Sequence, residues 1–105
     1  MTPAVGQVVT VFRSRLVEGD TGYGDDAARI AELARSMPGY VEHKAFTAPD
    51  GERVTVVTFA DEASHAAWRD HPEHRAAVRR GVEGYYEQYS IQVGTTSYAS
   101  AWSRA

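Results

Sequence analysis

The order in which strand-like and helix-like segments alternate limits the fold more than any other feature of this sequence. Residues 7–16 are rich in β-branched side chains, which is typical of a strand. In residues 23–37 the apolar side chains recur three and four positions apart, as they do on one side of a helix. Two more strands are predicted at residues 40–48 and 52–60, joined by the turn sequence Pro49-Asp50-Gly51. The first half therefore runs strand, helix, strand, strand.

The second half adds a broken helix and a last strand. A short helix capped by Asp61 is expected to end near Asp70, and Pro72 suits the first position of a second helix. Apolar side chains with 4-3-4 spacing predict the buried side of that second helix; they are Val78, Val82, Tyr85 and Tyr89. Residues 90–98 alternate as in a strand. The order βαββαβ predicts an α+β, ferredoxin-like subunit with a four-stranded antiparallel sheet.

The predicted first and third strands carry apolar side chains on both faces. Helices in this arrangement cover one face of the sheet, so the other face would leave a large apolar patch in water. A second copy of the chain is the simplest cover for this patch. The sequence therefore predicts a homodimer.

Composition excludes several classes of protein. A chain of 105 residues is expected to form a single domain over residues 1–105. Its 14 acidic against 11 basic side chains argue against a nucleic-acid partner, and the absence of cysteine excludes disulfides and thiolate chemistry. No apolar run reaches the roughly 20 residues of a membrane span, and the start of the chain does not read as a signal segment. We expect a cytoplasmic protein without a membrane partner.

A resemblance to a known family extends across most of the chain. The segments that carry it are residues 12–16, 37–40, 68–74 and 85–89. In these segments the sequence resembles the antibiotic biosynthesis monooxygenase family, whose members are dimeric α+β barrels built from two ferredoxin-like subunits. The resemblance implies a small-molecule substrate, and in some members oxidation by O2 without flavin or metal.

Other members of the family bind and open haem, which leaves haem as the alternative cofactor. Several members use a tryptophan on the helix after the third strand together with an asparagine, and Trp68 stands at the matching place. This sequence contains no asparagine, and it has Val78 where the haem-degrading members place a histidine. The expected activity is thus a cofactor-independent monooxygenase, with a haem-binding or non-catalytic ligand-binding protein as the alternative.

Trp68, His43 and His71 are the candidate catalytic residues. Trp68 either faces the cavity or fills core volume. His43 shares a face of small side chains with Ala45, which leaves room for a ligand beside a titratable base, although a packed core histidine has the same pattern. His71 lies near Trp68 in the sequence, and the alternative for a histidine before Pro72 is a helix cap.

The expected substrate-binding residues are mostly aromatic, and they are Phe12, Arg13, Phe59, His74 and Tyr86. Arg13 would hold a phenolate if its strand face looked into the cavity, and otherwise would pair with Glu42 or Glu52. His71 and His74 lack a third ligand nearby, so no metal site is predicted. His65 is interpreted as a surface residue.

Overall fold

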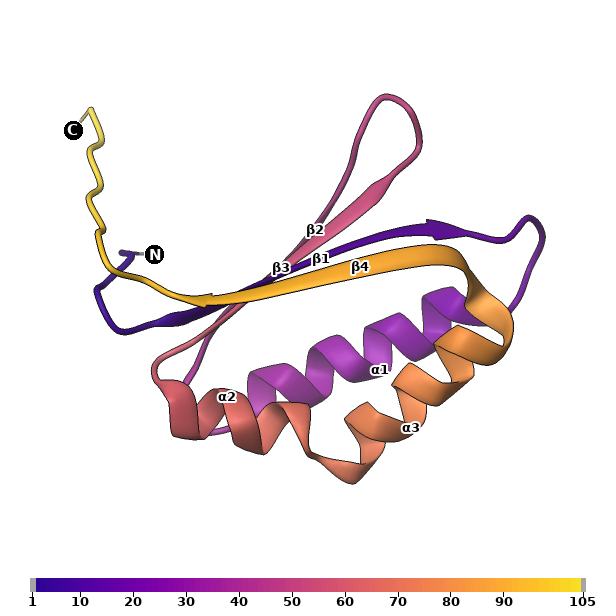
Figure 1. The fold of residues 1–105 in the computed structure, drawn as a ribbon, viewed down its shortest axis with the longest axis horizontal. Coiled ribbons are helices and arrows are strands. Elements are labelled where there is room, and N and C mark those ends of the chain that lie inside the picture. Colours follow the sequence, from indigo (N-terminus) through magenta and orange to yellow (C-terminus); the bar gives the residue numbers. More distant parts are fainter. Residues whose placement is uncertain (1, 105) are drawn as a thin grey trace.

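The computed structural model describes residues 2–104 and has the predicted order of elements. The elements are β1 (Val8–Leu16), α1 (Tyr23–Ser36), β2 (Tyr40–Thr47), β3 (Arg53–Phe59), α2 (Glu62–Arg69), α3 (Pro72–Arg80), the π-helical turn η1 (Gly81–Tyr85) and β4 (Tyr86–Thr95). The strands form one antiparallel sheet in the order β2-β3-β1-β4 (Figure 1). The predicted βαββαβ arrangement is confirmed.

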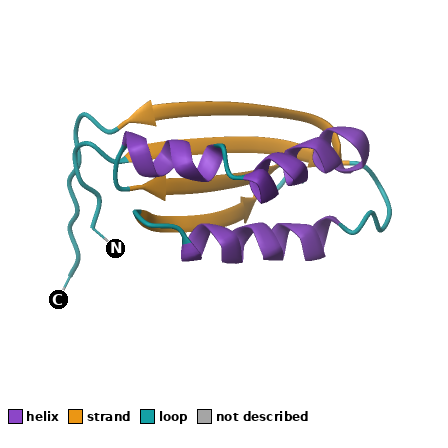
Figure 2. Ribbon diagram, turned by 90° about the horizontal axis from the view of Figure 1, so that it is seen from below, coloured by secondary structure: helices purple, strands orange, loops and turns teal. Residues whose placement is uncertain are grey.

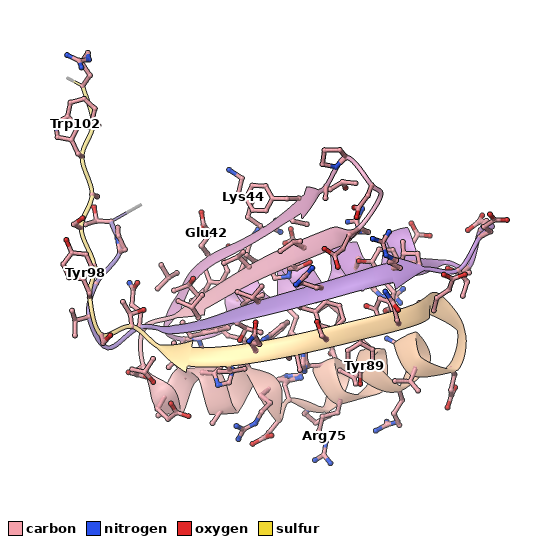
Figure 3. The ribbon with its side chains drawn as sticks, turned by 45° about the horizontal axis from the view of Figure 1, so that its top comes forward. Glu42, Lys44, Arg75, Tyr89, Tyr98 and Trp102 are labelled. Carbon is pink, nitrogen blue, oxygen red and sulfur yellow. The ribbon has the colours of Figure 1, made fainter. Side chains whose placement is uncertain are left out.

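The helices form a single layer over one face of the sheet (Figure 2). Thr10 of β1 pairs with Val57 of β3, which belongs to the core beneath the helices. Because side chains alternate along a strand, Phe12 shares this helix-covered face and Arg13 lies on the opposite one. Glu42 of β2 projects from the face on which Arg13 lies, away from the helices (Figure 3).

The buried core lies where α1 and α2 meet β3. Phe59 and Ala34 are fully buried, and Val57 and Trp68 are nearly so. Partly buried apolar side chains surround this core, namely Ile30, Leu33, Met37 and Tyr40. Three of them belong to the apolar series of α1 that the sequence indicated, so the helical spacing there identified the packed side.

A capping box sets the start of α2. The Asp61 side chain accepts a hydrogen bond from the backbone N–H of Ser64 (2.8 Å), and the Ser64 hydroxyl lies 3.3 Å from the backbone N–H of Asp61. Gly39, with φ 82°, packs against Ser64 so closely that any Cβ there would lie 2.4 Å from the Ser64 Cβ. These contacts fix the orientation of α2 about its axis, with Trp68 directed toward the core.

The predicted second helix is too long, because after Arg80 it continues only as the π-helical turn η1, to Tyr85, and does not reach Tyr89. The α-helix ends at Arg80, and the chain enters β4 at Tyr86. Strand pairing with β1 replaces helical hydrogen bonding, beginning with the Val17 N–H, which donates to the Tyr85 carbonyl (2.9 Å). Tyr89 is therefore a strand residue, and Val82 is 59% exposed rather than buried. The last strand is Tyr86–Thr95, not residues 90–98.

None of the helices in residues 2–104 is both long and apolar enough to cross a membrane.

Candidate active site

A cavity of about 690 Å³ lies between the helix-covered face of the sheet and the helices. Aromatic side chains from β1, α1, α2, η1 and β4 contribute to its wall; these are Phe12, Tyr23, Trp68, Tyr85, Tyr86 and Tyr89. Apolar walls with a few polar groups are typical of sites for planar small molecules. The cavity is the candidate site.

The apolar edge of the cavity runs along β4. Tyr89, Ile91 and Val93 line the cavity and are each about half exposed. Figure 3 shows Tyr89 on the helix side of the sheet. A ligand entering over β4 would cover apolar surface that now faces water, which favours binding of an apolar, flat molecule.

Trp68 lies in the cavity wall at the end nearest the core. It is 5% exposed and stacks on Phe59, with ring centroids 5.9 Å apart. Phe59 is fully buried behind it and lies outside the cavity lining, which corrects the prediction that Phe59 contacts substrate. Both alternatives for Trp68 hold at once, because it belongs to the core cluster and also faces the cavity.

His74 packs against Trp68 and lines the cavity. The ring centroids are 4.3 Å apart, and the His74 Nδ1 lies 3.1 Å from the carbonyl oxygen of Arg69. Since a carbonyl oxygen only accepts hydrogen bonds, Nδ1 must carry the proton and Nε2 keeps its lone pair. Burial lowers the pKa of His74. This histidine is neutral at neutral pH, with one basic nitrogen unused by the Arg69 contact.

His43 lines the cavity from β2, as its strand face predicted. It is half-buried and pairs with Val57 of β3 in the sheet register. Burial lowers its pKa, and the positive charge of Arg35 lowers it further. His43 is thus a second neutral imidazole on the wall.

His65 was predicted at the surface, and the structure places it in the cavity wall at 5% exposure. Its Nε2 lies 3.4 Å from the hydroxyl oxygen of Thr10, which is 7% exposed. A sequence signal for this placement existed, because His65 precedes Trp68 by three positions and so shares its side of the helix. Burial lowers the pKa of His65, and the charge of Arg69 contributes.

His71 lies outside the cavity lining, contrary to the prediction. Its Nδ1 accepts a hydrogen bond from the backbone N–H of Glu73 (3.1 Å) and so caps α3, with Pro72 in the first helical turn. The helix-capping alternative describes this residue. Its ring is thus engaged at the helix N-terminus, and His71 does not line the cavity as the other three histidines do.

Arg13 also lies away from the cavity, on the uncovered face of the sheet. Its guanidinium donates to Glu52, with Nη2 at 2.9 Å from Oε1, and the pair is partly exposed. Arg15 pairs instead with Asp50 at 2.8 Å. The ion-pair alternative for Arg13 is therefore what the structure shows, and the expected phenolate contact is corrected.

Phe12 and Tyr86 line the cavity together, with ring centroids 5.4 Å apart. Gly81 permits this position of Tyr86, because a Cβ on residue 81 would lie 2.4 Å from the tyrosine ring. Burial raises the pKa of the Tyr86 hydroxyl, which keeps it protonated. Both residues are placed as predicted for a substrate wall.

The opposite end of the cavity holds an ion-pair network that the sequence interpretation missed. The buried carboxylate of Asp26 on α1 accepts from Arg80 (Nε and Nη2, both 2.7 Å), from Arg29 (2.7 Å) and from the Tyr85 hydroxyl (3.0 Å). These contacts, above all the Arg80 pair, hold the pKa of Asp26 well below its usual range. The network ties α1 to α3 and η1.

The site can be compared with what a metal ion or a haem would need from the chain. Within residues 2–104, no three His, Asp or Glu side chains converge in a way that could hold a metal ion. Val78 lines the cavity where the haem-degrading members are expected to have a histidine, and its side chain has no ligating atom. A haem ligand at the position expected from the family is therefore absent from the described side chains.

Residues 8–80 match the family described as antibiotic biosynthesis monooxygenase. The chain belongs to this family. It is 35% identical over 92 residues to the uncharacterized protein YqjZ of Bacillus subtilis, a match that covers 88% of this chain and 81% of YqjZ. The resemblance seen in the sequence is confirmed at the level of the family.

Solved structures share the fold of this chain. SnoaB of Streptomyces nogalater, a cofactor-independent oxygenase, superposes with a TM-score of 0.73 at 17% identity, covering 89% of this chain and 95% of SnoaB. A protein of Mesorhizobium loti with a ferredoxin-like fold superposes with a TM-score of 0.69 at 18% identity, covering 87% and 97%. These likenesses establish the ferredoxin-like fold.

Proposed function

We propose that this monooxygenase-family chain oxidises a planar phenolic or enolisable small molecule with O2, without flavin, metal or haem, in secondary metabolism. The observation that carries the proposal is the state of His74. Its hydrogen bond to Arg69 leaves the Nε2 lone pair free beside Trp68, in a wall that carries several aromatic side chains. SnoaB, which shares the fold, is described as a cofactor-independent oxygenase.

The reaction needs a base, a positioned substrate and exclusion of water. His74 removes a proton from an activated CH2 or hydroxyl group of the substrate, and His43 is the second candidate for this step. The resulting anion gives one electron to O2, and the radical pair combines to a peroxide. For a CH2 group, loss of water from the peroxide leaves a carbonyl, so that CH2 and O2 become C=O and H2O.

Aromatic side chains restrict the orientation of the substrate for this step. Phe12, Trp68 and Tyr86 offer flat apolar surfaces in the cavity wall. A substrate held between such surfaces reacts from a restricted set of orientations, and the apolar surroundings strengthen every charge interaction in the site. Trp68 therefore acts through positioning.

Oxygen uptake tests the proposal. Purified protein, free of metal and flavin, is mixed with anthrone or a hydroquinone, and O2 consumption is followed with an electrode. We expect uptake well above the spontaneous rate, a quinone product and a colourless protein. Absence of enzyme-dependent uptake would count against the activity, and a sharp Soret band on adding haem would support the haem alternative instead.

The proposed functional unit is a homodimer. The sheet face away from the helices carries apolar side chains that one chain leaves without a helical cover, namely Val9, Val11, Phe46, Val54 and Val56. A second copy packed face to face would remove this surface from water. Light scattering after gel filtration should give twice the mass of one chain at micromolar concentration, and a monomer mass would refute the dimer.

A further inference from the structure

The cavity wall contains a second buried histidine, His65, whose polar atoms the proposed mechanism does not use. Within residues 2–104, the Nδ1 of His65 is a buried side-chain nitrogen without a hydrogen-bond partner. Its other ring nitrogen, Nε2, contacts the hydroxyl of Thr10 at 3.4 Å, and both side chains are more than nine-tenths buried in the cavity wall. Buried polar atoms are usually paired, so this pair calls for an explanation.

Apolar neighbours surround the Thr10 hydroxyl on the sheet. Thr10 is central in β1, and its partners are Val57 on β3 and Val93 on β4. On the same face of β1 the next cavity residue is Phe12. A single hydroxyl in such a row is costly to bury unless it bonds to something, and His65 accounts for one of its bonds.

The need to pair buried N–H groups decides whether Thr10 or His65 donates the hydrogen bond between them. If Thr10 donated to Nε2, the neutral ring would carry its proton on Nδ1, leaving a buried N–H with no acceptor. If Nε2–H donates to Thr10, the unpaired atom is a bare lone pair, which proteins tolerate better. The second arrangement leaves the threonine proton free to point into the cavity.

We propose that Thr10, oriented by His65, is the hydrogen-bond donor for an oxygen of the substrate and stabilises the negative charge on that oxygen after deprotonation. This inference rests on the proposed function and assigns the residue that meets the carbonyl or phenolic oxygen of its substrate. Thr10 contacts the substrate, and His65 is a positioning residue. A donor fixed toward a developing oxyanion stabilises it without reorganisation.

The neutral state of His65 agrees with this arrangement. Burial, the largest effect, and the charge of Arg69 lower its pKa, so one ring nitrogen carries a proton and the other does not. The β-branched side chain of Thr10 has restricted rotation, which keeps its oxygen at one place in the wall. The strand therefore supplies a rigid donor and the helix orients it.

Binding of 4-nitrophenolate tests the assignment without catalysis. Its affinity is measured by absorbance titration for the wild type, Thr10→Val and Thr10→Ser. Loss of a hydrogen bond to a charged oxygen should weaken binding about tenfold in Thr10→Val, and Thr10→Ser should stay within about twofold of the wild type. 4-Nitrotoluene has a methyl group in place of the phenolate oxygen and should bind all three proteins with the same affinity.

Further variants separate donation from packing. His65→Leu should weaken 4-nitrophenolate binding and change the absorption of the bound phenolate, whereas His65→Gln, which keeps a donor, should restore part of both. Thr58→Val removes a buried threonine hydroxyl on the other face of the sheet and should leave the affinity unchanged. Circular dichroism confirms that each variant is folded.

The inference and the proposed function fail in different ways. Equal affinity of the wild type and Thr10→Val for 4-nitrophenolate, or no binding by the wild type at millimolar probe, overturns the inference even if anthrone-dependent O2 uptake is intact. Selective weakening in Thr10→Val supports the donor site even if the wild type consumes no O2, in which case the proposed oxidation is the part that fails.

Discussion

The two ends of the cavity differ in how completely their polar groups are paired. At the Asp26 end the carboxylate accepts four hydrogen bonds from Arg29, Arg80 and Tyr85. At the Trp68 end the histidines retain free nitrogen atoms. A carboxylate accepts about four hydrogen bonds, so the Asp26 end is saturated and stabilises the fold. The Trp68 end keeps hydrogen-bonding capacity for a ligand.

The largest expected effect is on turnover at the unsaturated end. His74→Gln removes the proposed base and should lower kcat about 100-fold, since general bases typically contribute 10²- to 10⁴-fold. His71→Gln, on the same helix but outside the cavity lining, is the matched control and should keep kcat within about twofold. Steady-state O2 uptake measures both. If His74→Gln kept the wild-type kcat, His74 would not be the base, and the assignment would pass to His43.

The next effect is on stability at the saturated end. Asp26→Asn removes the buried negative charge and should lower the free energy of unfolding by about 2–3 kcal/mol, less than for a fully buried pair because the arginines reach water. Urea unfolding followed by circular dichroism measures the change. Equal stability of the two proteins would show that the network is dispensable.

The same variant has a predictable pH dependence. The folded-state pKa of Asp26 is lowered, so its stabilisation is fully present above the unfolded-state pKa of about 3.9 and is lost as the pH falls further below it. The difference in stability between wild type and Asp26→Asn should therefore shrink as the pH falls from about 5 toward 2. A difference that stays constant over this range would contradict the assigned charge.

Most of the fold followed from the spacing of apolar residues. The strand and helix order, the capping box at Asp61 and the apolar side of α1 are local patterns. Where the helix after Pro72 ends is not decided locally, because Tyr89 fits helical spacing but pairs with Ser14 of β1 instead. Long-range strand pairing overrode the local period there.

The site was predicted in part, for reasons that differ between residues. His43, Trp68, His74, Phe12 and Tyr86 line the cavity as expected. Arg13 was misplaced because alternation along β1 separates the two faces but does not say which face the helices cover. His65 was missed although its spacing from Trp68 placed both on one side of α2.

A smaller effect is expected where Trp68 positions the substrate. Trp68→Phe keeps an aromatic surface against His74 but removes part of it, so we expect a severalfold rise in KM with a smaller fall in kcat. Tyr98→Phe, on the exposed tail beyond β4, is the control and should change neither constant. If Trp68→Phe lowers kcat as much as His74→Gln does, the indole takes a direct part in the reaction.

The smallest effect is expected from an exposed ion pair on α1, away from the uncovered sheet face. Glu32→Gln breaks the contact with Arg35 and should change the free energy of unfolding by less than about 1 kcal/mol, as exposed ion pairs typically do. Side-by-side urea titrations of Glu32→Gln and Asp26→Asn compare the two ion pairs directly. A larger loss of stability in Glu32→Gln than in Asp26→Asn would contradict the stabilising role assigned to the buried network.

Nuclear magnetic resonance of the histidine rings tests the central claim most directly. Protein labelled with ¹⁵N in histidine is titrated with acid, and then with 4-nitrophenol at pH 7. His43, His65 and His74 should all titrate below the ordinary histidine pKa of about 6.5, with His74 protonated on Nδ1, and their ring signals should move when the phenol is added. Histidine pKa values of about 6.5, together with ring signals that do not shift when the phenol is added, would contradict a cavity lined by neutral histidines that face the ligand.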